Sequence, residues 1–268
     1  MRVRRAALIS TEERAARSSV LISAARLTRT RGDYAAARAH LEESLTIART
    51  LGHAGRVGIV LYHLGNVLRD AGDVAAARPL FEESLAVGRA LPDDRIACAA
   101  LFGLGAVALQ VGDDATAQAV LEDSVAIAQT TNRDVEVSAL VYLGVVATRR
   151  GEFALACDRF AASLAANRPL GNQDYLATIL DLMAGLPAAQ GDYARALRVY
   201  GAVDALNERL GARLDALRQA ERQHWLARAE RALSRAAREA AWVEGRTMSP
   251  QEAVAGALAA AASSEPHE

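Results

Sequence analysis

The sequence contains no lysine: all 31 basic residues among its 268 are arginine, and 32 acidic residues leave a formal net charge of -1. Without a lysine amine the chain cannot form a Schiff base or supply the phosphate-binding lysine of a P-loop. Aromatic residues make up only 4% and there are six prolines, whereas hydrophobic residues make up 51%. Alanine, leucine and valine therefore supply most of the apolar mass, a composition typical of helices.

Cysteines and long apolar runs are also scarce. Cys98 and Cys157 are too few for a disulfide framework and favour a reducing compartment. The apolar run at residues 6–9 is too short for the core of a signal peptide. The longest uncharged run, residues 96–112, is shorter than the ~20 residues that a membrane-spanning helix needs. We therefore expect a cytoplasmic protein without a membrane segment.

A glycine followed by an acidic residue recurs along the chain. The pairs are Gly32-Asp33, Gly72-Asp73, Gly112-Asp113, Gly151-Glu152 and Gly191-Asp192, at intervals of 40, 40, 39 and 40 residues. Matching residues surround each pair. Five residues later stands an alanine, nine later a large apolar residue, and twelve later a serine in the first four copies (Ser44, Ser84, Ser124 and Ser163), which Val203 replaces in the fifth.

Each feature of this repeat predicts part of a helical hairpin. The glycine ends one helix in the left-handed conformation, and the carboxylate after it caps the next helix. Small residues let two antiparallel helices approach, and large ones fill the space between them. One hairpin cannot bury its apolar face alone, so the hairpins are expected to stack.

The repeat resembles the tetratricopeptide repeat family. The resemblance rests on Leu64-Gly65, Leu104-Gly105 and Leu143-Gly144, and on the Gly-Asp-Tyr starts at residues 32–34 and 191–193. The period of 40 exceeds the family's usual ~34 residues, which implies longer helices; HEAT and armadillo repeats have suitable periods but lack this register. The resemblance implies an all-α, right-handed α-solenoid of about five helix-turn-helix repeats with extra C-terminal capping helices.

We divide the chain accordingly. Residues 1–17 are expected to form an N-terminal helix or half repeat, residues 18–211 the five repeats, residues 212–262 the capping helices and residues 263–268 a disordered tail. Ser249, Pro250 and Glu252 form a good helix start. Pro79 and Pro187 fall inside expected helices, where proline kinks the backbone.

A narrower resemblance covers roughly residues 18–262. Residues 241–246, Ala-Trp-Val-Glu-Gly-Arg, and Glu252-Ala253-Val254 look like the tail of the repeat arm of STAND-class ATPase transcriptional regulators, of the LuxR-type and cyclase-linked groups. In those bacterial regulators the arm senses a ligand or partner and restrains the ATPase. This sequence has no P-loop, so the resemblance implies an orphan or truncated sensing arm.

Residues that could support catalysis are not arranged for it. No two of the five histidines have metal-ligand spacing, and Glu221 with His224 is half of a di-metal motif. Gly103 and Gly105 lack a third glycine and fall in the repeat register. We expect no enzyme activity, metal or cofactor. Acidic residues are interspersed with the arginines, which argues against a nucleic-acid surface.

The concave side is the best candidate site, since the first helix of each hairpin lines it in tetratricopeptide stacks. By that geometry the groove-facing residues include Arg26, Arg29, Tyr62, His63, Asn66, Arg69, Phe102 and Tyr142, and later Asp181. The early positions are polar and basic and the middle ones apolar. This pattern suits a peptide with an acidic end and an apolar body. The alternative is that the protein's own terminal helices cover the apolar stretch.

Two functions follow. The first is a non-enzymatic scaffold that binds a protein or peptide partner through the concave groove. The second is the sensing arm of a STAND-type regulator, with a small-molecule effector bound where the array meets the C-terminal helices, near Trp225 and Trp242. Packing of the cap is the other explanation of the two tryptophans. Self-association through an uncovered terminal repeat stays open.

Overall fold

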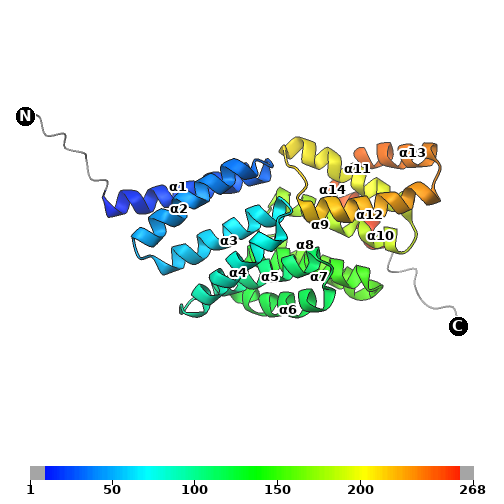
Figure 1. The fold of residues 1–268 in the computed structure, drawn as a ribbon. Coiled ribbons are helices and arrows are strands. Elements are labelled where there is room, and N and C mark those ends of the chain that lie inside the picture. Colours follow the sequence, from blue (N-terminus) through cyan, green and yellow to red (C-terminus); the bar gives the residue numbers. More distant parts are fainter. Residues whose placement is uncertain (1–9, 260–268) are drawn as a thin grey trace, which may run out of the picture.

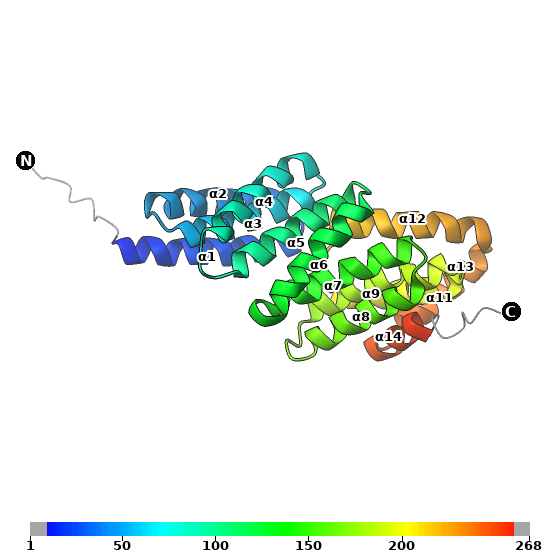
Figure 2. The ribbon, with the colours of Figure 1, turned by 90° about the horizontal axis from the view of Figure 1, so that it is seen from below.

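The computed structural model describes residues 10–259, and over that range it consists of α-helices and their connections. Five hairpins pair α1 (Thr11–Thr30) with α2 (Tyr34–Thr50), α3 (Ala54–Asp70) with α4 (Val74–Arg89), α5 (Arg95–Gln110) with α6 (Asp114–Thr131), α7 (Arg133–Arg149) with α8 (Phe153–Asn167), and α9 (Gln173–Met183) plus α10 (Gly185–Ala189) with α11 (Tyr193–Leu210). α12 (Ala216–Ala232), α13 (Arg235–Arg246) and α14 (Pro250–Leu258) follow. The hairpins stack into an elongated array with α1 and α13 toward opposite ends (Figures 1 and 2). The predicted right-handed α-solenoid with C-terminal capping helices is confirmed.

The recurring glycines make the turns of the hairpins. Gly72, for example, has φ of 92°, in the left-handed region that a side chain disfavours. The next residue then caps the second helix: Asp73 accepts a hydrogen bond from the backbone N–H of Ala76 at 3.1 Å. The same cap forms in the first, third and fifth hairpins, but Glu152 makes no such bond. The prediction of a capping carboxylate was therefore right for the aspartates and wrong for Glu152, whose side chain is one methylene longer.

Small and large residues interlock between the two helices of each hairpin. A Cβ atom added at Gly65 would come within 2.6 Å of the Phe81 ring, and one at Gly144 within 2.8 Å of Phe160. Both rings are fully buried. The recurring serines are fully buried as well, and Ser84 Oγ donates to the carbonyl oxygen of Gly58 at 2.8 Å. The serines are therefore more than small residues: they tie the second helix to the first.

The two interior prolines behave differently. Pro79 lies in the second turn of α4, which continues past it. Near Pro187 the first helix of the fifth hairpin divides at Ala184 into α9 and α10, as expected of a proline that removes a helical hydrogen bond.

The boundary expected between residues 17 and 18 is wrong, because α1 runs through it without a break. The helix begins at Ser10, whose side chain accepts from the N–H of Glu13 while Glu13 accepts from the N–H of Ser10. α1 is the first helix of the first hairpin. The rest of the expected N-terminal segment, residues 1–9, and the expected tail at residues 263–268 lie outside the described residues.

The C-terminal helices close the array, and α13 packs directly on α11. A Cβ at Gly245 would lie 2.0 Å from the carbonyl oxygen of Arg198, and one at Gly201 would lie 2.3 Å from that of Trp242. Paired glycines thus allow the two backbones to touch. α14 begins as predicted, with Ser249 as its cap, Pro250 in its first turn and Glu252 completing the capping box.

Candidate functional site: a groove on the concave side

A groove runs along the concave side between the first helices of the hairpins. Its outer cavity has a volume of about 520 Å³ and its inner cavity about 130 Å³. Arg29, Tyr62, Asn66, Ser138 and Tyr175 line both, so the two cavities lie next to each other. The first helices α1, α3, α5, α7 and α9 provide most of these walls because the curvature of the stack turns that side inward.

All eight residues predicted from the sequence line this groove. Arg26 and His63 line only the outer cavity; Arg69, Phe102 and Tyr142 line only the inner one; Arg29, Tyr62 and Asn66 line both. Their part in binding remains a prediction. Asp181, which we also expected in the groove, instead has its side chain buried against α12.

Several lining residues were missed from the sequence. The connection between α4 and α5 contributes Leu91, Pro92 and Asp93 to the outer cavity, and α9 contributes Tyr175. Asp215, which precedes α12, lines the inner cavity. The repeat register identifies faces of helices, so it could not predict the residues of a loop. The residues of α9 and of the start of α12 reach the same cavity as α1 only because the stack is curved.

The outer cavity combines apolar walls with basic residues. Ile59, Leu91, Ile96 and Val135 provide the apolar surface, and Ile59 is 40% exposed. Arg26 is exposed at this cavity, and no ion pair joins it to a carboxylate of residues 10–259.

His63 in the outer cavity is held neutral. Burial, and then the positive charges of Arg29 and Arg26, lower the pKa of His63 to about 3. The imidazole therefore adds no positive charge near neutral pH.

Asp70 binds two of the arginines that line the cavities, Arg29 and Arg69. Its carboxylate, 4% exposed, accepts from Arg69 Nη2 at 2.7 Å and from Arg69 Nε at 3.1 Å, and it also pairs with Arg29. Burial alone would raise the pKa of Asp70, but the charges of Arg69 and Arg29 lower it below its usual value. This cluster joins α1 to α3.

Three polar atoms around the inner cavity are buried without a hydrogen-bond partner: Asn66 Oδ1, Arg69 Nη1 and Arg29 Nε. Asn66 is only 4% exposed and Arg69 only 6%. The guanidinium of Arg69 lies 5.6 Å from the centre of the Phe102 ring, which packs against Tyr142 at 5.2 Å. Buried polar groups in folded proteins are normally satisfied, so these three atoms are an exception among the residues that line the inner cavity.

The C-terminal part of the chain closes the inner cavity. Arg213 N donates to the carbonyl oxygen of Thr30 at 3.3 Å, which brings the segment before α12 against the first hairpin. Asp215 Oδ1 then accepts from Arg218 N at 2.9 Å and caps α12. Burial, followed by the charge of Asp70, raises the pKa of Asp215. A residue of the C-terminal part thus lines the inner cavity, whereas the outer cavity is lined by residues between Arg26 and Tyr175.

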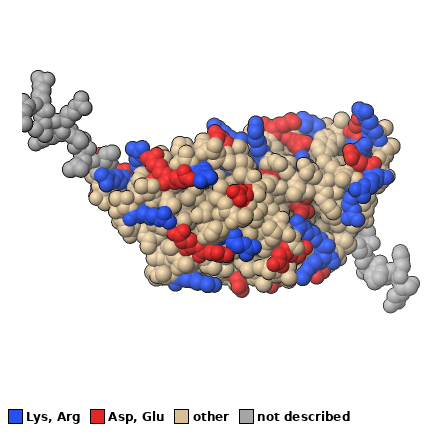
Figure 3. All heavy atoms as spheres, viewed as in Figure 1, with Lys and Arg blue, Asp and Glu red and all other residues tan. Residues whose placement is uncertain are grey.

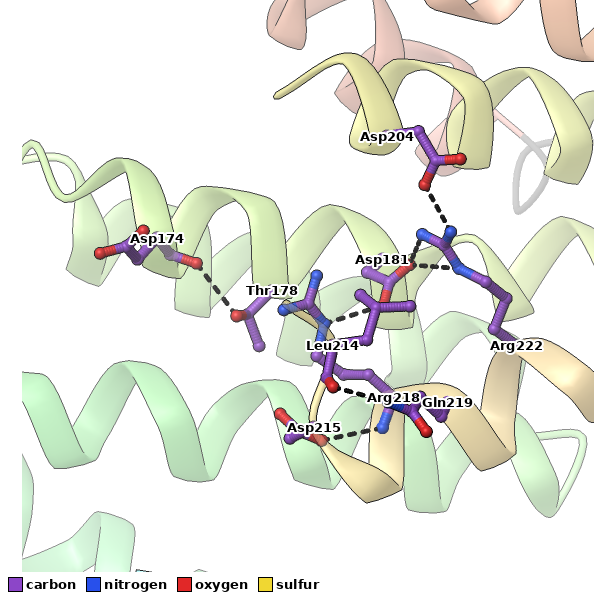
Figure 4. Close-up of polar contacts among 9 residues, drawn as sticks. All are labelled: Asp174, Thr178, Asp181, Asp204, Leu214, Asp215, Arg218, Gln219 and Arg222. Atoms are coloured by element: carbon purple, nitrogen blue, oxygen red, sulfur yellow. Dashed lines mark hydrogen bonds and ion pairs between the residues drawn. The ribbon is translucent and has the colours of Figure 1, made fainter. Parts of the chain in front are cut away.

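A buried ion network fixes α12 in this position (Figure 4). Asp181 of α9, 2% exposed, accepts from Arg218 Nε at 2.8 Å and from Arg222 Nε at 3.0 Å. Arg222 also binds Asp204 of α11 at 2.5 Å and lies over the ring of Tyr200. A single helix is therefore bound to two others through charges that water does not screen.

The two tryptophans of the C-terminal helices have different surroundings. Trp225 is 6% exposed and packs on Gly185, where a Cβ would lie 2.8 Å from its Nε1, so it serves as packing of the cap. The ring of Trp242 stacks on that of Tyr200, with 6.4 Å between the ring centres. Trp242 also lines a further, more open cavity of about 480 Å³, which lies between α11, α12 and α13. The ligand pocket expected near both tryptophans can therefore involve Trp242 alone.

Other kinds of site find little support in the described part of the chain. Residues 10–259 hold no group of three or more His, Cys, Asp or Glu side chains placed to bind a metal ion. None of the helices found there is both long enough and apolar enough to cross a membrane. On the face seen in Figure 3, arginines and carboxylates alternate, with no continuous basic surface.

These features define an α-solenoid with a groove on its concave side. Residues 19–53 and 56–130 match family models described as tetratricopeptide repeat, so this part of the chain is similar to that family. A search of curated proteins found no match.

Two solved structures share the fold. One is a Rap protein in complex with Competence and Sporulation Factor, similar over 88% of this chain and 67% of that chain with a TM-score of 0.58 and 15% identity. The other, of Podosopora anserina putative kinesin light chain TPR-like repeats, covers 74% of this chain and 98% of its own with a TM-score of 0.50 and 17% identity. At these identities the similarity establishes the fold alone.

Proposed function

We propose that this chain is a non-enzymatic scaffold that binds a peptide segment of a partner protein in its concave groove. The observation that carries the proposal is the groove itself: an outer cavity with apolar and charged walls lies next to an inner cavity whose lining residues include unpartnered buried polar atoms. Apolar walls with a few fixed polar groups are typical of ligand sites. Tetratricopeptide repeats also commonly bind protein partners.

The outer cavity favours a segment with an acidic residue followed by apolar ones. Arg26 is exposed and available for a carboxylate, while Ile59, Leu91 and Ile96 offer apolar contacts. The cavity also has carboxylates: Asp93 is paired with Arg95 at 2.6 Å, and Asp134 lies on the wall. The acidic residue of the peptide is therefore expected near Arg26.

Selection from a random peptide display library with the full chain tests the proposal, with affinities of the selected peptides measured by fluorescence anisotropy. We expect Arg26→Ala to weaken binding by about tenfold, the loss of one charge-assisted hydrogen bond. Arg38→Ala is the matched control, because Arg38 is an exposed arginine on α2 that pairs with Glu42. Failure to select any peptide with a folded chain, or equal effects of the two variants, would contradict the proposal.

The sensing arm of a STAND-type regulator is the second candidate. It is favoured by the cavity between α11, α12 and α13, because Trp242 lines that cavity and belongs to residues 241–246, the sequence that suggested this class. Quenching of tryptophan fluorescence by small molecules, compared between the natural chain and Trp242→Phe, tests it. A quenching response that Trp242→Phe leaves unchanged would exclude the cavity.

A further inference from the structure

Two arginines and one carboxylate line the inner cavity: Arg29, Arg69 and Asp215. Asp70 lies behind this lining and pairs with both arginines, so the four side chains together carry equal numbers of opposite charges. The guanidinium of Arg218, which lies nearby, is paired with Asp181. A ligand group that enters the cavity therefore meets surroundings with no net charge.

Residues that line this cavity carry both hydrogen-bond donors and acceptors without a partner. Arg69 Nη1 and Arg29 Nε are donors without an acceptor, and Asn66 Oδ1 is an acceptor without a donor. Asp215 is a further acceptor: the raised pKa of its carboxyl indicates that its charge is poorly compensated there. A ligand group must both accept and donate hydrogen bonds to satisfy all of them.

We propose that the inner cavity selects a side-chain carboxamide, Asn or Gln, of the bound peptide. This inference rests on the proposed function, since the peptide must first occupy the groove. A carboxamide is uncharged, its oxygen accepts and its NH₂ donates twice. The volume of about 130 Å³ is roughly ten times the ~10–15 Å³ that one water needs, so a small side-chain head group fits.

Other side chains fit the cavity less well. A carboxylate would lie close to Asp215, and it would leave Asn66 Oδ1 without a donor. An ammonium group would lie close to Arg29 and Arg69. An apolar side chain would bury these atoms unsatisfied, at a cost of about 1–3 kcal/mol for each.

The test uses the peptides selected by the full chain. We expect one position at which Asn or Gln is enriched, and at that position Gln→Glu, Gln→Lys and Gln→Met should each weaken binding at least tenfold. The variant Asp215→Asn removes one negative charge and keeps a good helix cap for α12, because asparagine caps as well as aspartate. In that variant the Glu peptide should bind more tightly than the Gln peptide.

Asp113→Asn is the matched control, since Asp113 caps α6 in the same way at an exposed site outside the groove. It should leave the order of affinity of the four peptides (Gln, Glu, Lys and Met) unchanged. Selected peptides that depend on Arg26 but show no preference for Asn or Gln at any position would overturn the carboxamide inference and leave the proposed function standing, with water filling the inner cavity. The carboxamide inference is also overturned if the Gln peptide still binds more tightly than the Glu peptide to Asp215→Asn. Failure to select peptides at all overturns both.

Discussion

Ser84 Oγ donates a hydrogen bond of 2.8 Å to the carbonyl oxygen of Gly58, 26 residues earlier in the chain. The same separation of 26 residues joins Ser124 to Cys98 and Ser163 to Val137, each at 2.8 Å, and Ser44 to Ser18. This bond therefore recurs in the first four hairpins and connects their two helices.

We expect Ser124→Ala to lower the free energy of unfolding by about 1 kcal/mol, the net value of a typical buried hydrogen bond. Urea denaturation followed by circular dichroism measures it. Ser23→Ala is the control, because Ser23 is exposed and bonds only within its own helix. Equal effects of the two substitutions would show that the bond between helices contributes nothing.

Gly245→Ala should displace α13 from α11. The added Cβ would lie 2.0 Å from the carbonyl oxygen of Arg198, so the backbones must separate, at a cost of about 1–3 kcal/mol or more. Hydrogen exchange of α13 and the fluorescence of Trp242 would report the change. Gly256→Ala in α14 offers the contrast: its Cβ would meet only Met248 at 3.8 Å, so this variant should gain up to about 1 kcal/mol from helix propensity.

Asp181→Asn should loosen α12. The substitution leaves Arg218 and Arg222 buried without their shared carboxylate, and removal of one partner of a buried ion pair destabilises by about 3–5 kcal/mol. Urea denaturation and faster hydrogen exchange across α12 would show it. Arg246→Ala breaks the exposed pair with Glu208 and should have little effect. Similar protection of α12 in the two variants would argue against the network.

Stability should fall as the pH is lowered from about 6.5 toward 3. Between these values the unfolded chain binds a proton at His63 that the folded chain does not, because burial and the charges of Arg29 and Arg26 lower the pKa of His63 to about 3. The stability is therefore present above pH 6.5 and is lost below it.

The measurement is the urea midpoint from pH 7 to pH 4.5, for the natural chain and for His63→Gln. The variant should show a shallower decline, since glutamine does not titrate. Parallel curves would mean that His63 takes up its proton equally in both states.

The groove shows what could be predicted from the sequence. The register of the repeats placed Tyr62, Asn66 and Arg69 on one face of a helix, and the resemblance to tetratricopeptide repeats implied that this face lies on the concave side. The register also predicted the close approach at Gly65 and Gly144, because only a side chain as large as phenylalanine fills the space that a glycine leaves. These are local properties, fixed by helical geometry and by residue size.

Other features could not be read from the sequence. The recurring serines could be required for their small size or for the hydrogen bond that their hydroxyl donates, and the sequence pattern is the same in both cases. The wrong boundary at residue 17 followed from counting periods, whereas the capping box of Ser10 and Glu13 sets the start of α1. The meaning of residues 241–246 also changed: Gly245 permits a backbone contact, and Trp242 lies on Tyr200.

The sequence alone thus determined the hairpins, their number and their inward faces, because a period of about 40 residues repeats interactions between neighbours in the chain. Only the tertiary structure decided that Asp215 enters the same cavity as Arg29, and that Asp181 binds α12 rather than a ligand. Such contacts depend on small rotations between successive hairpins. These rotations add up over five repeats, and no single repeat encodes their sum.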